Sequence, residues 1–124
     1  FVAWLQQQDF YENTTIVIAG DHSSMDNGYF ERVSYEGYER HIYNCIINSA
    51  VTTENTQNRA FCAFDMLPTT LAAMGCTVEG ERLGLGTNLF SSVPTLLERD
   101  GQAFLDKVAQ NSEYYTEKFF LETE

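Results

Sequence analysis

Basic residues are scarce in this sequence: 7 lysines and arginines stand against 18 aspartates and glutamates, which gives a formal net charge of −11. A nucleic-acid-binding protein needs a basic surface that displaces phosphate counterions, so this composition argues against that class. The same charge argues against unaided docking on an anionic membrane. The sequence also lacks an apolar run long enough for a membrane span or a signal peptide.

Cysteines are few and lack a metal-binding spacing. Cys45, Cys62 and Cys76 form no Cys-x-x-Cys pair, so a thiolate zinc site is not expected. The favoured interpretation is that all three are small buried side chains, and the alternative is one disulfide with one thiol left over.

Hydrophobic residues make up 44% of the 124 residues, which is typical of a globular chain and excludes a disordered one. The length fits one domain or part of one. The chain opens at Phe1 rather than Met, and residues 1–5 already resemble the interior of a helix. We therefore expect residues 1–124 to be a piece of a longer protein.

The pattern of apolar residues predicts alternating helices and strands. Residues 14–19 form a β-branched run without a polar break, which is typical of a central parallel strand covered on both faces. The sequence therefore predicts an α/β fold with a mostly parallel sheet flanked by helices. The expected elements are a helix at 1–12, strands at 14–19 and 41–49, and a long loop at 23–40 with room for one short helical turn. A helix at 66–74, a loop around a short extended piece at 80–91, and a helix at 95–121 that Asp100 and Gly101 can interrupt follow.

Asp21 and His22 stand side by side directly after the predicted strand at 14–19, which Gly20 ends. In open α/β sheets, functional residues lie just past the carboxyl ends of the strands. A carboxylate and a neutral imidazole suit a divalent ion such as Mn²⁺ or Zn²⁺. The pair therefore predicts a metal site, and a simple turn is the alternative.

Other polar residues are candidates for weaker roles. Ser23 could contact a phosphate through its hydroxyl, and Arg40 with His41 could bind phosphate or line a substrate pocket. A turn residue and a half-buried histidine at a strand end are the structural alternatives. Asp65 could be a third metal ligand, but the sequence around it favours the N-cap of the helix at 66–74.

Four motifs in order resemble the C-terminal half of the sulfatase-like phosphoglycerol transferases. These are the lipoteichoic acid synthases and the related enzymes that modify membrane-derived oligosaccharides, within the alkaline phosphatase superfamily. The resemblance covers residues 1 to about 120. The motifs are "NTTIVIAGDHSSMD", "YNCIINS", "FDMLPTTLAAMG" and "RLGLGTNLFS" followed by "PTLLE".

The resemblance implies a fold, a reaction and a place in the cell. It implies the C-terminal portion of an alkaline-phosphatase-like sandwich, with Asp21 and His22 as ligands of a catalytic Mn²⁺ or Mg²⁺. The remaining ligands, an acidic residue and a nucleophilic Thr, would lie upstream of this chain. The parent enzyme would move glycerophosphate from phosphatidylglycerol to a glycan or polyol acceptor, and it would be membrane-anchored at the extracytoplasmic face of the bacterial membrane.

Two other functions stay open at this point. A sulfatase or phosphatase of the same superfamily would share the Asp–His pair and differ in its upstream nucleophile. An acidic α/β module that binds a partner through residues 23–38 would need no metal. A chain that lacks the rest of its sheet would also expose a strand edge, so we expect self-association.

Overall fold

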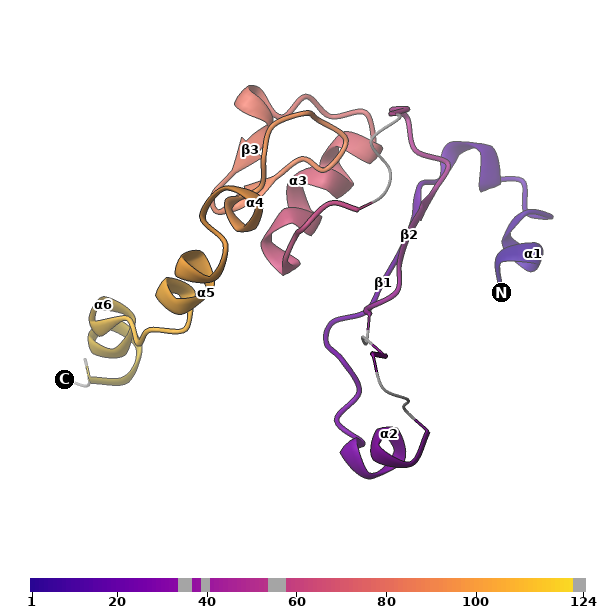
Figure 1. The fold of residues 1–124 in the computed structure, drawn as a ribbon. Coiled ribbons are helices and arrows are strands. Elements are labelled where there is room, and N and C mark those ends of the chain that lie inside the picture. Colours follow the sequence, from indigo (N-terminus) through magenta and orange to yellow (C-terminus); the bar gives the residue numbers. More distant parts are fainter. Residues whose placement is uncertain (34–36, 39–40, 54–57, 122–124) are drawn as a thin grey trace.

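The structure is a computed structural model that describes residues 1–33, 37–38, 41–53 and 58–121 (Figure 1). Short helices and two small strand pairs make up this part of the chain. In chain order they are α1 (Val2–Leu5), η1 (Tyr11–Asn13), β1 (Ile16–Ala19), α2 (Asn27–Val33), β2 (Asn44–Ile47), α3 (Ala63–Ala73), η2 (Glu79–Glu81), β3 (Arg82–Leu83), β4 (Gly86–Thr87), α4 (Leu96–Asp100), α5 (Gln102–Val108), α6 (Glu113–Thr116) and η3 (Glu117–Leu121).

The strands pair antiparallel, so the mostly parallel sheet predicted from the sequence is not present in the described residues. β1 and β2 pair with Ile16 opposite Ile47 and Ala19 opposite Asn44. β3 and β4 form a separate antiparallel pair. The chain turns back between β1 and β2, and strands that run in opposite directions pair without a crossover helix. The described chain is therefore a mixture of helices and small antiparallel sheets.

Helix α3 packs on the β3–β4 pair, and a glycine makes this close contact possible. A Cβ on Gly86 would collide with the Phe64 carbonyl group and would lie 3.0 Å from Pro68 Cδ. Pro68 has no N–H, so the Phe64 carbonyl oxygen lacks its usual helical partner and faces the passing strand. Only a glycine lets the β4 backbone approach the helix this closely.

Asp65 ties the start of α3 to β4. Its side chain is almost fully buried, with 1% of the residue exposed. Oδ1 accepts the Thr87 N–H at 2.7 Å, and Oδ2 accepts the Cys62 N–H at 2.9 Å. The helix begins at Ala63 with Cys62 as its N-cap, so the predicted N-cap role of Asp65 is wrong. Asp65 occupies the third helical position instead, where a carboxylate reaches back to the N-cap amide.

Thr69 adds a second polar link inside the same unit. Its hydroxyl donates to the Asp65 carbonyl at 2.6 Å and accepts the Leu89 N–H at 3.0 Å. The helix ends at Ala73 with Met74 as its C-cap, and Gly75 follows with φ +86°. That conformation is typical of a glycine just past a helix end, as the sequence predicts.

Arg59 joins the segment before α3 to the loop that leads into α4. Its guanidinium donates twice to the Glu98 carboxylate, at 2.8 and 2.7 Å, and also to the carbonyl oxygens of Leu89, Ser91 and Val93. These bonds use all five N–H groups of the side chain. The ion pair with Arg59 lowers the pKa of Glu98 to about 2.

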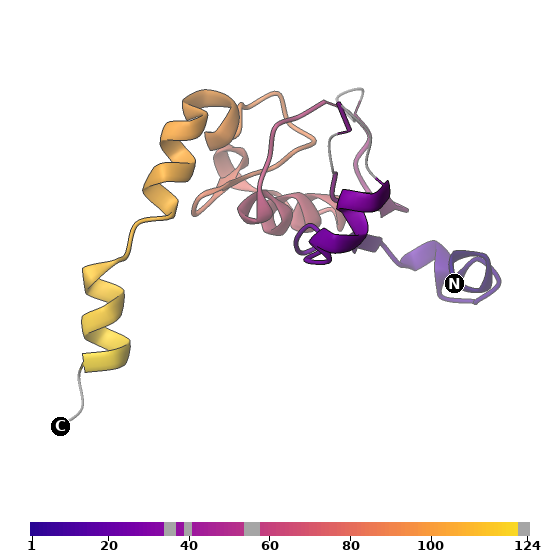
Figure 2. The same cartoon turned by 60° about the horizontal axis from the view of Figure 1, so that its bottom comes forward.

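The predicted helix at 95–121 is divided into several pieces. Thr95 caps α4, because its hydroxyl accepts the Glu98 N–H at 3.0 Å. Gly101, with φ +56°, separates α4 from α5 and confirms the predicted break. Helices α5 and α6 lead away from the α3 unit (Figure 2). At the other end, the predicted helix at 1–12 is reduced to α1 and a 3₁₀ turn.

Candidate metal centre

Gly20 ends β1 and turns the chain toward the candidate ligands. Its N–H donates to the Tyr43 carbonyl at 2.9 Å, which is the last bond of the β1–β2 ladder. A Cβ on Gly20 would lie 2.5 Å from Ile42 Cγ2, so the missing side chain leaves room for the approach to β2. Asp21 and His22 follow outside the strand, where the side chains of adjacent residues no longer alternate between opposite faces.

Asp21 and His22 hold each other in a defined arrangement. Asp21 Oδ1 accepts the His22 backbone N–H at 2.9 Å, which orients the carboxylate. His22 Nδ1 lies 2.8 Å from the Ser23 carbonyl oxygen. A carbonyl oxygen only accepts, so Nδ1 carries the hydrogen and Nε2 of the neutral ring holds a lone pair. That Nε2 lies 3.5 Å from Asp21 Oδ2.

This donor pair fits a divalent cation. An imidazole nitrogen and a carboxylate oxygen at this separation could both ligate one divalent cation. Histidines that bind metals commonly donate their other ring N–H to a carbonyl or a carboxylate, and Ser23 supplies that carbonyl here. The same spacing also suits a protonated imidazole, so a metal ion and a proton compete for Nε2.

The pair is open to solvent and incomplete. The side chains of His22 and Asp21 are 59% and 88% exposed. No group of three or more histidines, cysteines, aspartates and glutamates within the described ranges is arranged to hold a metal. Water or other residues would have to supply the rest of the coordination sphere, so we expect weak binding by this pair alone.

A small pocket of about 250 Å³ lies beside the end of β1. Asp21 and His41 both line it, together with Ile42 and residues near the start of α3. Its volume is that of about eight water molecules, enough for a small headgroup. The structure therefore brings Asp21 and His41 to one pocket, whereas His22 and Ser23 do not line it.

The remaining predicted residues have different positions. Ser23 takes part through its backbone carbonyl. Arg40 lies outside the described residues. Asp65 is not a third ligand of this pair, because both of its carboxylate oxygens accept backbone N–H groups inside the α3 unit.

Cys62 is a pocket residue that the sequence did not indicate. It lines the pocket next to Asp21, and its thiol lies 3.4 Å from Asp65 Oδ2. Burial raises the pKa of this thiol, so it remains protonated at neutral pH and is a poor nucleophile or ligand. All three cysteines are free, so the disulfide alternative is wrong. Cys45 and Cys62 are half-buried and Cys76 is exposed, so the prediction that all three are buried is also wrong. No sequence signal places Cys62 here, because only the packing of α3 near the end of β1 does so.

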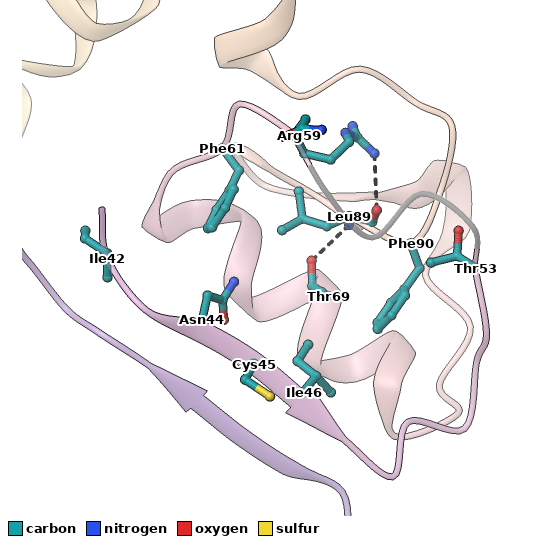
Figure 3. A pocket seen from close by; sticks show the side chains of 11 residues that line it. Ile42, Asn44, Cys45, Ile46, Thr53, Arg59, Phe61, Thr69, Leu89 and Phe90 are labelled. Carbon is teal, nitrogen blue, oxygen red and sulfur yellow. Dashed lines mark hydrogen bonds between the residues drawn. The ribbon is translucent and has the colours of Figure 1, made fainter. Parts of the chain in front are cut away.

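A larger pocket of about 440 Å³ lies between β2 and α3 (Figure 3). Ile46, Phe61, Leu89 and Phe90 make its walls largely apolar. Arg59 also lines this pocket, but its N–H groups are bonded to Glu98 and to three carbonyls. This arginine holds the loop in place and is not available for a phosphate.

Comparisons with known proteins returned no relative of this chain. No family model, no curated protein and no solved structure matches it. In the part of the chain that the structure describes, no helix has the length and apolar character to cross a bilayer.

Proposed function

We propose that this chain contributes Asp21 and His22 to the divalent-metal site of a sulfatase-like phosphoglycerol transferase. The supporting observation is that an imidazole nitrogen of His22 and a carboxylate oxygen of Asp21 lie 3.5 Å apart just past the end of β1. The Ser23 carbonyl fixes the tautomer that leaves this nitrogen bare. The resemblance of the four sequence motifs supplies the substrate class. Mn²⁺ or Mg²⁺ is the expected ion, and Zn²⁺ is the alternative.

A divalent ion at this pair would supply Lewis-acid charge to a phosphoryl oxygen. The chain's own residues hold the donors for it: the His22 N–H orients the Asp21 carboxylate, and Ser23 orients the His22 ring. His41 lines the adjacent pocket and can donate a ring N–H to a phosphodiester oxygen. In this proposal the pocket holds the glycerophosphate headgroup of phosphatidylglycerol, and an acceptor glycan or polyol then takes up the glycerophosphate.

The proposal has a direct consequence for residues 1–124 alone. The nucleophilic Thr and the acidic ligand implied by the resemblance lie outside this chain, so we expect no turnover by it. Incubation with phosphatidylglycerol and Mn²⁺ should leave the headgroup attached to the lipid. Clear headgroup release would contradict the proposal that the nucleophile and the acidic ligand lie outside this chain. Because the proposed donor is a lipid, the parent enzyme would act at a membrane, and the resemblance implies the extracytoplasmic face of a bacterial membrane.

The decisive test uses Asp21→Ala and His22→Ala in the longer protein that contains this chain. We expect each change to lower glycerophosphate transfer by at least about 100-fold in the presence of Mn²⁺, because each removes a proposed ligand. Asp106→Ala is the matched control, since Asp106 is an exposed carboxylate on α5 that bonds only to Gln102 among the described residues. Unchanged transfer in both variants would contradict the metal site. No transfer by the unmodified longer protein would favour a non-enzymatic interaction module. Hydrolysis of sulfate esters without glycerophosphate transfer would favour a sulfatase.

A further inference from the structure

Strand β1 has a free edge. The Gly20 N–H donates to the Tyr43 carbonyl, and Ile18 lies opposite Cys45 in the same register. Because N–H groups alternate in direction along a strand, those of Val17 and Ala19 point away from β2. The structure gives these two outward N–H groups no hydrogen-bond partner among the residues it describes. This edge is therefore available to another strand.

The sequence of the free edge lacks the charges and the proline that protect many edge strands. Residues 14–20 contain no charged residue and no proline, and all five residues from Thr14 to Ile18 are β-branched. Such β-branched runs favour extended pairing. Natural edge strands usually carry a lysine, a proline or a bulge that blocks association. The sequence of β1 thus favours pairing with a further strand.

The exposed area of the whole chain is large for its mass. The chain exposes 9768 Å². A folded monomer of 14.1 kDa is expected to expose about 6,700 Å². A stable dimer buries about 800 Å² on each partner, so the excess of about 3,000 Å² is more than enough to supply one such interface. The C-terminal helices, which project from the rest of the chain in Figure 2, and exposed apolar side chains such as Trp4, Phe10 and Tyr43 contribute to this exposed area.

We propose that two copies of this chain pair edge to edge through β1. The strands run antiparallel about a two-fold axis at Val17, with Thr15 of each copy opposite Ala19 of the second copy. This register uses every outward N–H and C=O from Thr15 to Ala19 and forms about six backbone hydrogen bonds. The product is a four-stranded sheet in the order β2, β1, β1, β2. Since residues 14–20 are uncharged, no like charges face each other across the new pairing.

The proposed pairing leaves the candidate metal centre unobstructed. Asp21 and His22 of the two copies lie at opposite ends of the four-stranded sheet, about 26 Å apart at about 3.3 Å per residue. Association and metal binding are therefore separable. Failure of one proposal leaves the other standing.

Sedimentation equilibrium across a wide range of protein concentrations tests the proposal. We expect the mass to rise from 14.1 kDa to twice that value. Val17→Pro removes one outward N–H and no bond of the β1–β2 ladder, because proline is tolerated where the strand N–H faces solvent. We expect it to weaken association at least about tenfold. Val17→Thr keeps the N–H and the branched side chain, so it should associate like the original chain.

Amide hydrogen exchange on the unmodified chain gives a second readout that does not depend on the folding of the proline variant. With rising concentration, exchange should slow at Val17 and Ala19, whereas Ile16 and Ile18 are protected by β2 at every concentration. A monomer at all concentrations would overturn the proposal. So would association that survives Val17→Pro in a folded protein, growth into open-ended assemblies, or concentration-dependent protection confined to another surface.

Discussion

The two antiparallel strand pairs of this chain differ in a way that strand length does not explain. β1 and β2 pair over four residues each, yet Ala19 and Asn44 at the end of the pair are exposed. β3 and β4 are two residues each, yet Gly86 and Thr87 are buried. A two-residue pair gains little from its own hydrogen bonds, so its burial comes from α3 packed against it.

The two strand pairs belong to regions that differ in how they are stabilised. The buried side chains of Asp65, Thr69 and Thr95 are all hydrogen-bonded and hold the unit of α3, β3, β4 and α4 together. The β1–β2 sheet has one buried residue, Ile16, among the eight in its strands, and it carries the candidate metal ligands at its end. We infer that the α3 unit is stable on its own contacts, whereas the sheet needs a further strand or partner.

Replacing Asp65 should break the stable unit most severely. In Asp65→Asn, the amide nitrogen must face either the Thr87 N–H or the Cys62 N–H, so one buried donor loses its acceptor. We expect a loss of about 3 kcal/mol in the free energy of unfolding, as for other broken buried networks of charged groups. Urea unfolding followed by circular dichroism measures the loss. Asp26→Asn is the matched control, because Asp26 is exposed and its carboxylate accepts the Tyr29 N–H in the first turn of α2, where an asparagine oxygen can accept it as well.

Gly86→Ala tests the close approach of β4 to α3. The added methyl group would collide with the Phe64 carbonyl, so the strand must move away from the helix. We expect a loss of about 2 kcal/mol in stability, in the range of other overpacked sites. Gly28→Ala in α2 is the control, since its Cβ meets only Asp26 Oδ1 at 3.8 Å and should be neutral or slightly stabilising. Equal stability of the two variants would contradict the tight packing of this unit.

The ion pair between Arg59 and Glu98 predicts a pH dependence that belongs to the α3 unit. The pKa of Glu98 is lowered from 4.5 to about 2 in the folded state, chiefly by its hydrogen bonds with Arg59. A carboxylate with a lowered pKa stabilises the folded state above pH 4.5, and this contribution is lost as the pH falls toward 2. Glu98→Gln should therefore lower stability by about 2 kcal/mol at pH 7, with a difference that shrinks below pH 4.5.

Unfolding curves of Glu98→Gln and the original chain between pH 2 and pH 7 give the measurement. Asp100→Asn is the control, because the Arg99–Asp100 pair is exposed and should contribute close to nothing. If the two proteins differ in free energy of unfolding by the same amount at every pH in this range, the lowered pKa of Glu98 is not due to its pair with Arg59.

Local patterns in the sequence predict several helices and strands, but they do not predict which distant segments these elements contact. The β-branched run predicts β1, and Gly75 and Gly101 mark helix ends where the structure has them. The direction of pairing, the β3–β4 hairpin and the burial of Asp65 depend on contacts between distant segments. Asp65 resembles an N-cap in sequence, and only its bond to Thr87, 22 residues away, shows its different role.

For the candidate site, too, the sequence predicts one part and not the other. The position of Asp21 and His22 after the first strand could be predicted from their place in the sequence. The Ser23 carbonyl that fixes the His22 tautomer, and the pocket that Asp21 shares with His41 and Cys62, could not. Both depend on backbone geometry past Gly20 and on the approach of α3.

Paramagnetic broadening by Mn²⁺ tests the metal pair most directly. Substoichiometric Mn²⁺ is added to the isotope-labelled chain, and the imidazole and backbone signals of His22 are followed by NMR. We expect signals of residues 20–23 to broaden first, and Asp21→Asn or His22→Gln to remove this preference while the fold is kept. Even broadening over the many carboxylates of this acidic chain, unchanged in both variants, would contradict a metal site at Asp21 and His22.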